Sequence, residues 1–434
     1  MFKFSFMEEY NRIDIQQICS HICSGGTPKS TVAEYYDGNI PWLNTKEINF
    51  NRIYETEKTI TEEGLNNSSA KWIPANSVIV AMYGATAGKT AITKIPLTTN
   101  QACCNLTIDS TKADYRFVYY ALFNDYSYLA SLTNGGAQQN LNAQQIKEFE
   151  IPFPSLEEQK RIADILSSID DKIVLNRRIN ENLEQQAQAL FKAWFVDFEP
   201  FKDGEFVDSE FGMIPKGWDI KPLEYLVTKV KSGDWGKDEP TGNHTIKTFC
   251  MRGADFPNIK EGNKGKMPIR YILEKNFREK SLCDGNVVVE ISGGSPTQST
   301  GRIVLVDKSF IADCDNALIC TNFCKSLEIK ENYSFFFYLM WQYLYDSKVM
   351  FIYENGSNGL KNLNINSLIE RESFVIPTKE VVARFNLVAS NLLSTKQANG
   401  IEISRLAYLR DTLLPKLMSG ELRIDEIETK NDYE

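Results

Sequence analysis

Two long heptad patterns constrain the fold of this chain more than any other feature. The first begins at Ser155 and ends at Phe198, and neither Gly nor Pro interrupts it. Apolar residues or Asn recur in it every seven positions, at Ile162, Ile169, Asn176, Leu183 and Leu190. Its opening, Ser155-Leu-Glu-Glu158, has the form of a capping box. The pattern predicts a helix of about 40 residues, on the order of 60 Å long, which needs a partner in a folded protein.

The second pattern supplies that partner. It follows Pro377, and each of its members lies 223 positions after its counterpart: Phe385, Leu392, Asn399, Leu406 and Leu413. Two unrelated amphipathic helices would have no reason to place Asn at the same rung. We therefore predict an internal duplication whose two helices pack antiparallel. Asn176 and Asn399, near the two midpoints, are expected to meet at a pseudo-two-fold axis and to fix the register.

Charge and composition limit the kinds of function. The 434 residues carry a net charge of -9, which argues against indiscriminate binding to nucleic acid. The charge is uneven, because positions 229–280 hold twelve basic and seven acidic residues while the tail 421–434 holds two basic and six acidic ones. A positive face is therefore compatible with the acidic total. Two His residues leave little material for catalysis based on imidazole.

The N-terminus and the cysteines indicate a location. Residues 1–9 lack the apolar core of a signal peptide, and no apolar run reaches about 18 residues, so neither secretion nor a membrane span is expected. Nine Cys without a Cys-x-x-Cys pair are typical of reduced thiols in a cytoplasm. Cys19-Ser-His21-Ile-Cys23 has ligand-like spacing but no second half, so we predict no metal site.

Each heptad pattern follows a strand-rich block, and the two blocks share motifs in the same order. Those of the first block are Ser24-Gly25, a strand and hairpin at 78–84, Gly88-Lys89, Asn100-Gln-Ala102, an aromatic helix at 114–132 and Gln139-Asn-Leu-Asn142. Their matches in the second block are Ser232-Gly233, 287–294, Gly301-Arg302, Asp315-Asn-Ala317, 334–345 and Lys361-Asn-Leu-Asn364. Two similar frames with different polar loops suggest two similar tasks on different targets.

One loop of the first block has the appearance of a phosphate-binding loop. Gly84-Ala-Thr-Ala-Gly88-Lys89-Thr90 has three residues between its glycines, where such a loop needs four. A phosphate-binding loop must also open a helix, but residues 91–96 have the pattern of a strand. We therefore predict a β-hairpin here and no nucleotide site.

Six motifs spread over nearly the whole chain carry a family resemblance. They are Ser-Gly-Gly-Thr-Pro at 24–28, Met-Tyr-Gly-Ala-Thr-Ala-Gly-Lys at 82–89, Asn-Gln-Ala at 100–102, Ile-Pro-Phe-Pro-Ser-Leu-Glu-Glu-Gln-Lys-Arg-Ile at 151–162, Ile-Pro-Lys-Gly-Trp at 214–218 and Leu-Leu-Pro-Lys-Leu-Met-Ser-Gly-Glu-Leu at 413–422. In this order they resemble the specificity (S) subunit of type I DNA restriction-modification enzymes. The second block departs from the pattern by reading Ser-Gly-Asp-Trp-Gly in place of Ser-Gly-Gly-Thr-Pro.

The resemblance implies an α+β fold in which two long antiparallel helices separate two similar target-recognition domains. The implied parts are a first recognition domain at 1–154, a spacer helix at 155–198, a linker at 199–216, a second recognition domain at 217–377, a second helix at 378–420 and an acidic tail at 421–434. Each recognition domain would read one half of an interrupted, asymmetric site in double-stranded DNA. The helices would dock two modification subunits that use S-adenosylmethionine. Two motor-nuclease subunits that use ATP and Mg²⁺ would complete the assembly, and this chain itself is expected to bind no cofactor and to hold no catalytic residue.

Candidate DNA contacts lie in the polar and Gly-rich loops. Polar side chains read base edges, and glycines let backbone N–H groups approach phosphates. In the first block they are Ser24, Gly25, Gly26, Thr27, Lys29, Tyr83, Gly84, Thr86, Lys89, Asn100, Gln101, Gln138, Gln139 and Asn140. In the second block they are Ser232, Lys237, Arg252, Ser295, Gln298, Arg302, Asn316, Asn358 and Lys361. Each could equally be a solvated or turn-capping residue, so the prediction concerns the set of loops.

Three alternatives stay open at this point. The chain could serve a related two-subunit methylation system, or it could be a coiled-coil scaffold without a DNA role. A scaffold would show no specific binding of oligonucleotides. A nucleotide-dependent activity at residues 84–90 would require ATP binding that the substitution Lys89→Ala abolishes.

Overall fold

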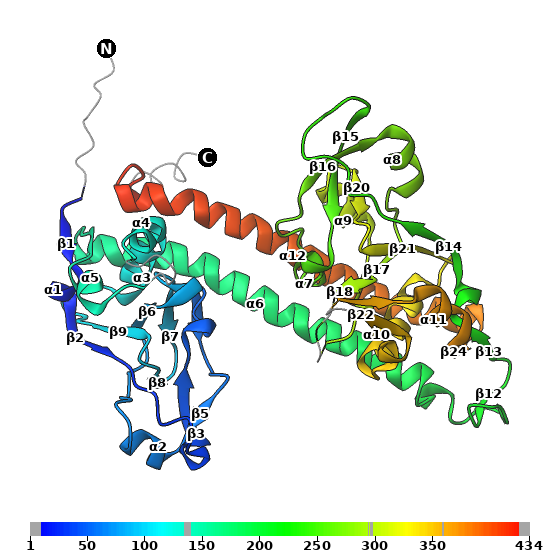
Figure 1. Ribbon diagram of the computed structural model, residues 1–434, viewed down its shortest axis with the longest axis horizontal. Coiled ribbons are helices and arrows are strands. Elements are labelled where there is room, and N and C mark those ends of the chain that lie inside the picture. The colour runs from blue at the N-terminus through cyan, green and yellow to red at the C-terminus, as the bar shows by residue number, and fades with distance from the viewer. Residues whose placement is uncertain (1–9, 134–139, 294, 296–297, 358–359, 425–434) are drawn as a thin grey trace. The chain divides into compact units, whose positions relative to one another are not determined.

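The computed structural model describes residues 10–133, 140–293, 295, 298–357 and 360–424. The chain divides into two compact units: unit 1 is Met1–Asp171 with Leu406–Glu434, and unit 2 is Lys172–Arg405. Each unit contains one strand-rich block and a part of each of two long helices, α6 (Leu156–Phe195) and α12 (Lys379–Ser419) (Figure 1). The two long helices predicted from the heptad patterns are therefore present.

The start of α6 has the local structure that its sequence encodes. Ser155 Oγ accepts a hydrogen bond from the backbone N–H of Glu158 at 3.2 Å, which is the Ser half of the predicted capping box. The helix then continues for 40 residues, the length expected from the uninterrupted heptads.

Unit 1 is mainly β-sheet. Its strands are β1 (Arg12–Asp14), β2 (Cys19–Ser24), β3 (Tyr36–Leu43), β4 (Asn51–Ile53), β5 (Thr59–Ile60), β6 (Val78–Ala81), β7 (Thr90–Thr93), β8 (Thr98–Thr99), β9 (Cys103–Ile108) and β10 (Glu150–Pro152). Its short α-helices are α1 (Ile15–Ile18), α2 (Glu62–Asn66), α3 (Tyr115–Asn124), α4 (Tyr126–Ser131) and α5 (Ala143–Lys147). The aromatic helix expected at 114–132 is thus two helices, because Asp125 leaves helical backbone angles and ends α3.

A five-stranded sheet in the order β2-β9-β6-β7-β4 forms the centre of unit 1. Its middle strand β6 reads Val-Ile-Val-Ala, and all four residues are buried, as expected for a β-branched run covered on both faces. Helix α3 packs six of its residues into this core, which also includes Leu166 of α6 and Leu417 of α12. The long helices are therefore part of the hydrophobic core of unit 1.

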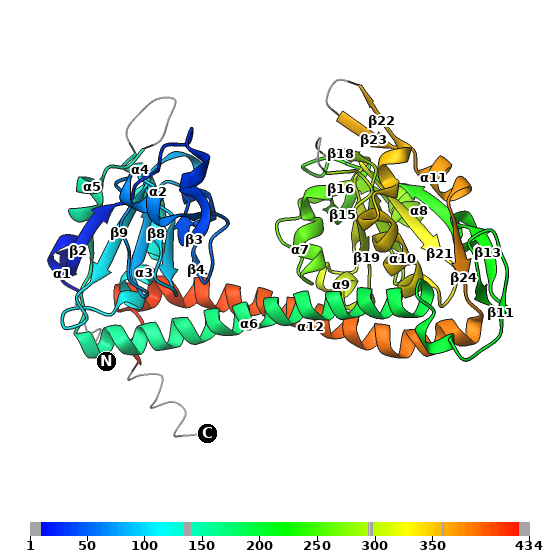
Figure 2. The same ribbon diagram turned by 90° about the horizontal axis from the view of Figure 1, so that it is seen from below.

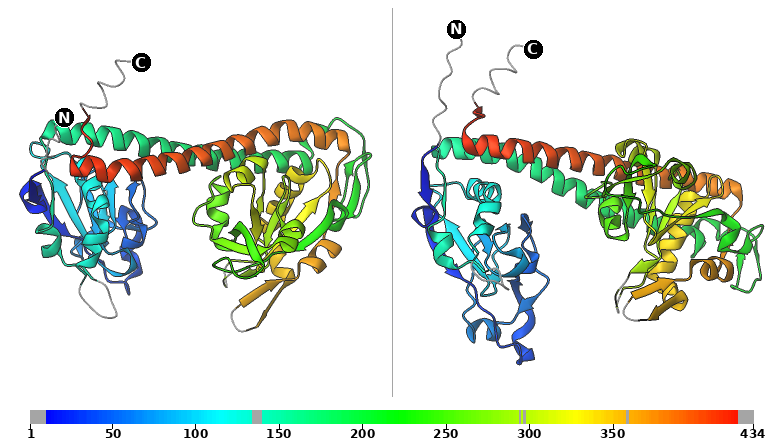
Figure 3. Two further views of the ribbon diagram at one scale, coloured as in Figure 1. Left: turned by 90° about the horizontal axis from the view of Figure 1, so that it is seen from above. Right: turned by 45° about the horizontal axis from the view of Figure 1, so that its top comes forward.

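Unit 2 has more elements. Its strands are β11 (Phe206–Val207), β12 (Ile214–Pro215), β13 (Asp219–Pro222), β14 (Val227–Ser232), β15 (His244–Met251), β16 (Ile269–Leu273), β17 (Val287–Glu290), β18 (Ser292–Gly293), β19 (Ile303–Leu305), β20 (Leu318–Cys320), β21 (Cys324–Ile329), β22 (Glu354–Ser357), β23 (Leu360–Leu363) and β24 (Ser373–Ile376). Its short α-helices are α7 (Phe256–Lys260), α8 (Glu274–Lys280), α9 (Lys308–Asp313), α10 (Ser334–Asp346) and α11 (Ile365–Arg371). The β22–β23 hairpin projects away from the long helices of this unit (Figures 2 and 3).

Two sheets of unit 2 repeat the strand order of two sheets of unit 1, except that β4 has no counterpart among the described strands of unit 2. The order β14-β21-β17-β19 corresponds to β2-β9-β6-β7, and β16-β15-β20 corresponds to β5-β3-β8. In both smaller sheets the central strand is antiparallel to one neighbour and parallel to the other. The register shift at the start of β14 also has its equivalent at the start of β2. The predicted internal duplication is confirmed.

Strand pairing corrects one motif match. In unit 1 the loop 100–102 connects β8 with β9, and in unit 2 the corresponding connection from β20 to β21 is the loop 321–323. Asp315 and Asn316 instead follow α9 and precede β20, and both have positive φ. The match of these residues with Asn100 and Gln101 is therefore wrong, because similar letters stand at different strand connections.

Two other matches agree with the structure. Gly88-Lys89 and Gly301-Arg302 each lead into the strand that pairs with the buried central strand, since Thr90 lies opposite Val80 and Ile303 opposite Val289. Asn142 and Asn364 each cap the short helix that follows.

Within unit 2 the long helices pack antiparallel. Asn176 Nδ2 donates to Glu402 Oε2 at 2.7 Å, and eight positions further along α6 Glu184 Oε2 accepts from Lys396 Nζ at 2.6 Å. Positions thus ascend on one helix as they descend on the other. The antiparallel arrangement predicted for the helix pair is confirmed.

The two central asparagines do not meet as predicted. Asn399 Nδ2 donates to Asn180 Oδ1 at 3.0 Å, whereas Asn176 bonds Glu402. The side chain opposite Asn399 is therefore one helical turn beyond the predicted one. Both asparagines lie in the helix interface, but Asn180 takes the partner expected for Asn176.

A loop of unit 2 explains this register. Gly262 lies so close to α12 that a Cβ on Gly400 would overlap its backbone. Asn180 Nδ2 donates both to the Glu261 carbonyl at 2.9 Å and to the Lys396 carbonyl at 3.0 Å. Asn180 therefore joins the loop, α6 and α12, a role that depends on tertiary contacts and leaves no trace in the heptad pattern.

Candidate nucleic-acid interface

Three loops of unit 1 emerge at one edge of the five-stranded sheet. Strand β9 pairs antiparallel with both β2 and β6, with Ser24 opposite Cys104 and Ala81 opposite Cys103. The segments that follow β2 and β6 therefore lie beside the segment that precedes β9. We call residues 25–29, 82–89 and 100–102 the edge loops of unit 1. They contain most of the candidate DNA contacts of the first block.

The same construction recurs in unit 2. Strand β21 pairs with β14 and β17, with Ser232 opposite Lys325 and Glu290 opposite Cys324. We call residues 233–237, 321–323 and the described part of 291–301 the edge loops of unit 2. The duplication thus produces two sets of loops on the same backbone plan.

The glycines after β2 hold their loop against the sheet. A Cβ on Gly25 would overlap the backbone of Thr99, and one on Gly26 would overlap that of Ala70. Trp42 Nε1 donates to the Gly26 carbonyl at 2.9 Å. Because both glycines are buried, they form the framework of the loop, and its exposed neighbours present the side chains.

Some polar side chains of the edge loops of unit 1 have hydrogen-bond partners within the unit, and others are exposed. Lys89 Nζ donates to Asn49 Oδ1 at 2.8 Å, and Thr27 Oγ1 is hydrogen-bonded to Gln101. Asn100 serves the turn itself, because its Oδ1 accepts the Ala102 N–H at 3.1 Å. The remaining described candidates of this block are exposed or partly exposed: Ser24, Lys29, Tyr83, Gly84, Thr86 and Asn140. Gln138 and Gln139 lie outside the described residues.

The loop from 82 to 89 is a hairpin connection, as predicted. Strands β6 and β7 are antiparallel, and the Gly88 N–H donates to the Ala81 carbonyl at 2.8 Å. Gly88 has a φ of 83°, which favours glycine. Thr90 begins a strand, whereas a phosphate-binding loop must begin a helix. The geometry therefore excludes the Walker-type nucleotide site that the glycine spacing resembled.

Arg302, the counterpart of Lys89, forms its hydrogen bonds with other residues of unit 2. Its Nε and Nη2 each donate to a Glu290 carboxylate oxygen at 2.7 Å, and Nη2 also donates to the Gly253 carbonyl at 2.9 Å. The Glu290 side chain is only 6% exposed. Glu290 occupies the place of Ala81 in unit 1, since both precede the hairpin and pair with the first residue of the neighbouring strand. Arg302 therefore neutralises a buried carboxylate that unit 1 lacks.

Two further cations of unit 2 are paired as well. Arg252 donates through Nε and Nη2 to the two oxygens of Asp255 at 2.9 and 2.8 Å. Lys361 forms an ion pair with Glu354 at 3.0 Å. These side chains are held in fixed directions before any ligand binds.

The other candidates of unit 2 occupy turns or exposed positions. Ser232 Oγ accepts from Lys325 Nζ at 2.6 Å, and the Gln298 N–H donates to Ser295 Oγ at 3.0 Å. Lys237 and Asn316 are exposed. Asn316 belongs to the connection between α9 and β20, and Asn358 lies outside the described residues.

Sequence reasoning missed the aromatic residues of the edge loops of unit 2. Trp235 and Phe323, with Asn322 and Arg252, line a cleft of about 490 Å³. The signal for Trp235 was present, because Ser-Gly-Asp-Trp-Gly departs from the Ser-Gly-Gly-Thr-Pro pattern at this place. Phe323 carried no such signal, since the wrong motif match put Asp315-Asn-Ala317 in its position.

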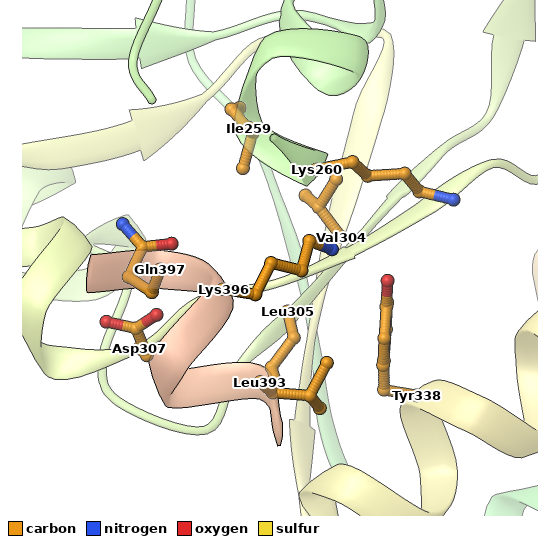
Figure 4. Close-up of a pocket in the computed structure, with 9 residues that line it drawn as sticks. All are labelled: Ile259, Lys260, Val304, Leu305, Asp307, Tyr338, Leu393, Lys396 and Gln397. Carbon is orange, nitrogen blue, oxygen red and sulfur yellow. The ribbon is translucent and has the colours of Figure 1, made fainter. Parts of the chain in front are cut away.

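A buried polar cluster joins unit 2 to its long helices. Tyr338 Oη donates to Glu184 Oε1 at 2.9 Å, and Lys396 Nζ approaches the other oxygen of the same carboxylate at 2.6 Å. Burial opposes ionisation of Glu184, but the positive charges of Lys396 and Lys260 and the hydrogen bonds outweigh it, so the pKa of Glu184 is below its ordinary value. The adjoining cavity, shown in Figure 4, has a volume of about 30 Å³. This suits a water molecule and is too small for a substrate.

Unit 1 contains a similar trio. Tyr120 Oη donates to Asp170 Oδ2 at 2.6 Å, and Arg410 Nη1 approaches Asp170 Oδ1 at 2.9 Å. In each unit, therefore, a tyrosine of the aromatic helix bonds an acid on α6 that also pairs with a cation on α12. The trios anchor each strand-rich block to the long helices, and no edge-loop residue takes part in them.

The described residues lack two kinds of feature. They hold no group of three or more His, Cys, Asp or Glu side chains arranged to bind a metal ion. None of the helices they form combines the length and apolar character needed to cross a bilayer.

Comparisons with known proteins identify the family. Residues 7–185 match the model of the type I restriction modification DNA specificity domain. The type I restriction enzyme MjaIX specificity subunit of Methanocaldococcus jannaschii is 31% identical over 98% of this chain and 99% of its own length. The HindI specificity subunit of Haemophilus influenzae is 25% identical over 69% of this chain and 74% of its own. The solved S subunit of the type I restriction-modification system of M. genitalium has the same fold, with a TM-score of 0.59 at 17% identity over 96% of this chain and 98% of that one. This chain belongs to the family of type I restriction-modification specificity subunits.

Proposed function

We propose that each unit of this specificity subunit reads one half of an interrupted, asymmetric DNA site through its edge loops. The observation that carries the proposal is the duplicated sheet, in which four strands recur in the same order while the edge loops differ in side chains. Equal frames with unequal loops are what two half-sites of different sequence require. Polar side chains of the edge loops at 27, 89 and 101 in unit 1 and at 322 in unit 2 are of the types that contact phosphates and base edges, and so is Arg252, which lines the same cleft as Asn322.

The long helices are the proposed docking surface for two modification subunits. Both carry large apolar side chains in exposed positions, with Leu175 52% and Leu387 71% exposed in unit 2 and Tyr408 76% exposed in unit 1. Each of the three has a second exposed apolar residue close to it on its helix, Ile179, Val388 and Leu409 respectively, and contiguous exposed apolar surface indicates a protein partner. The modification subunits would supply S-adenosylmethionine and the methyl transfer, and two motor-nuclease subunits would supply the chemistry that uses ATP and Mg²⁺. This chain would contribute recognition and spacing.

The half-site proposal is tested by mapping and domain exchange. Co-expression with the cognate modification subunit, followed by methylation mapping with long-read sequencing, gives the bipartite site. Replacing residues 12–154 by those of a relative should then change one half of the site and preserve the other half. A site in which both halves change, or neither does, contradicts the assignment of one reader to each unit.

The docking proposal has a separate test. Leu387→Asp and Tyr408→Asp should each reduce the number of modification subunits in the purified complex, measured by native mass spectrometry. Phe211→Asp is the matched control, because Phe211 is an exposed apolar residue beside the β11–β12 hairpin, 53% exposed, and belongs to neither long helix. Full occupancy in both helix variants would contradict docking on these surfaces.

A further inference from the structure

The edge loops of unit 2 border an aromatic cleft, and the described residues of unit 1 carry no ring at the positions equivalent to its two large rings. Its volume of about 490 Å³ lies within the range typical of small-ligand sites, roughly 300–1,000 Å³. Two large rings border it, and they remain accessible in the folded chain: Trp235 is 39% exposed and Phe323 64% exposed. In unit 1 the strand pairing puts Thr27 and Ala102 at these two positions. Among the described residues, rings at these two positions are therefore a feature of unit 2.

The tryptophan of the cleft is held in place. The guanidinium of Arg270 lies 4.1 Å from the centroid of the Trp235 ring, and Arg270 Nε donates to the Trp235 carbonyl at 2.8 Å. The preceding residue is fixed too, because the Asp234 N–H donates to the Cys320 carbonyl at 2.8 Å. The Arg270 side chain is 6% exposed, so this support belongs to the core of the loop. Trp235 is a preorganised platform, which lowers the entropic cost of stacking a ligand on it.

The polar groups of the cleft suit the edge of a base. Asn322 is exposed beside Phe323, and an Asn amide can bond adenine through one donor and one acceptor. Arg252 borders the same space and is oriented by Asp255, with 38% of its side chain exposed. Aromatic faces with edge-reading amide and guanidinium groups form the combination that binds bases outside a duplex.

We propose that this cleft receives one nucleobase of the second half-site, displaced from the DNA stack, with Trp235 and Phe323 against its ring and Asn322 at its edge. The inference rests on the proposed function, because it assumes that unit 2 reads DNA. A base inside a duplex presents only its edges, whereas a concave site with ring surfaces on its walls needs an accessible base face. Displacement also makes recognition of that position sensitive to the strength of its base pair.

The test uses the complete complex of this chain with its modification subunits, on DNA that carries the mapped site. A mismatch is placed opposite each base of the second half-site in turn, and affinity is measured by fluorescence anisotropy. A mismatch opposite the displaced base should tighten binding about 10-fold, because the base pair no longer has to be broken. The methylated adenines serve as an internal reference, since methyltransferases themselves extrude their target base.

The variants assign that signal to the cleft. Trp235→Ala and Phe323→Ala should each weaken binding of the specific DNA about 10-fold, the scale of one lost base–aromatic stack, and should abolish the mismatch signal except at the methylated adenines. Trp235→Phe should retain most of the affinity. Phe211→Ala is the matched control for an exposed phenylalanine of the same unit and should change nothing.

Two outcomes overturn the inference. One is the absence of any mismatch signal in the second half-site apart from the methylated adenines. The other is an equal loss of affinity for specific and unrelated DNA in the Trp235 and Phe323 variants, which would indicate lost backbone contacts or lost folding. In both cases specific binding by the wild-type complex would show that the proposed function still holds. If the wild-type complex bound no specific sequence, the proposed function itself would fail.

Discussion

The edge loops of the two units occupy equivalent places in two corresponding sheets, but their side chains differ in charge and in burial. In unit 1 the position before the hairpin is Ala81, and Lys89 extends to the exposed Asn49. In unit 2 the equivalent positions are Glu290 and Arg302, which form a partly buried ion pair. The two units thus keep the same strand register, while the basic residue bonds an exposed side chain in unit 1 and a buried carboxylate in unit 2.

A second difference between the two units concerns the aromatic side chains of the edge loops. The polar contact between Thr27 and Gln101 in unit 1 is replaced in unit 2 by Trp235, Asn322 and Phe323 around an open cleft. At these equivalent positions unit 1 therefore carries small polar groups, whereas unit 2 carries two rings with one amide. Under the proposed function, these equivalent loops would contact DNA by different chemistry.

The largest expected effect is the difference in folding stability between the variants Arg302→Ala and Lys89→Ala. Arg302→Ala should lower the free energy of unfolding by about 3–5 kcal/mol, because it leaves the Glu290 carboxylate buried and unpaired. Lys89→Ala should change stability by less than about 0.5 kcal/mol, as for an ordinary surface substitution. Chemical denaturation of both variants measures the difference.

A double variant and a DNA measurement complete this comparison. Glu290→Ala combined with Arg302→Ala should recover most of the lost stability, since the uncompensated charge is gone. Lys89→Ala should weaken DNA binding with little dependence on sequence and reduce the salt slope by about one if it contacts phosphate. Equal stability of the two single variants would refute the distinction drawn between the two positions.

The next effect concerns the loop that fixes the helix register in unit 2. Asn180→Leu should cost about 2 kcal/mol, because it removes the donor to the buried carbonyls of Glu261 and Lys396. Asn176→Leu should leave stability unchanged or raise it, since Asn176 Oδ1 has no hydrogen-bond partner among the described residues and its Nδ2 bonds the partly exposed Glu402. Thermal unfolding of the two variants side by side is the measurement. A larger loss for Asn176→Leu would restore the register role that the heptad pattern assigned to it.

A smaller effect tests the similarity of the two anchors. Tyr120→Phe and Tyr338→Phe each remove one hydrogen bond to a charged carboxylate and should each cost about 1.5 kcal/mol. Differential scanning calorimetry of both variants should give similar losses, in contrast to the unequal edge substitutions. Strongly unequal losses would mean that the trios are similar in form but different in energy.

The smallest effect is a pH dependence expected from unit 2. Because the pKa of Glu184 is lowered in the folded chain, its contribution to stability is complete above its ordinary value of 4.5 and is lost as the pH falls through the folded pKa. The free energy of unfolding should therefore decrease on acidification below that value. Glu184→Gln should remove this component, and a variant with an unchanged acid profile would show that other carboxylates carry it.

Sequence patterns located the elements better than they located the contacts. The heptads predicted α6 and α12, because helical periodicity is local information, and closure of the duplicated chain predicted their antiparallel packing. The spacing around Gly84 and Gly88 was enough to predict a hairpin instead of a nucleotide loop. The partner of Asn399 could not be found in this way, because it depends on how closely Gly262 approaches Gly400.

The candidate site shows the same division. Residue types and Gly-rich loops predicted which segments are candidate DNA contacts, and antiparallel strand pairing brings most of those of unit 1 together. By contrast, the orientation of the Arg252 and Arg302 side chains depends on their ion pairs with Asp255 and Glu290, respectively. A pattern that reads each loop separately cannot see a partner supplied by another segment.

Periodicity and motifs in a fixed order were enough to predict the duplication, the two long helices and the family. The helix register, the counterpart of the loop 100–102, the ion pair of Arg302 and the cleft beside Trp235 became visible only in three dimensions. Each of these depends on which groups from distant parts of the chain approach one another. Periodicity along the chain places a side chain on a face, and packing in three dimensions decides what that side chain meets there.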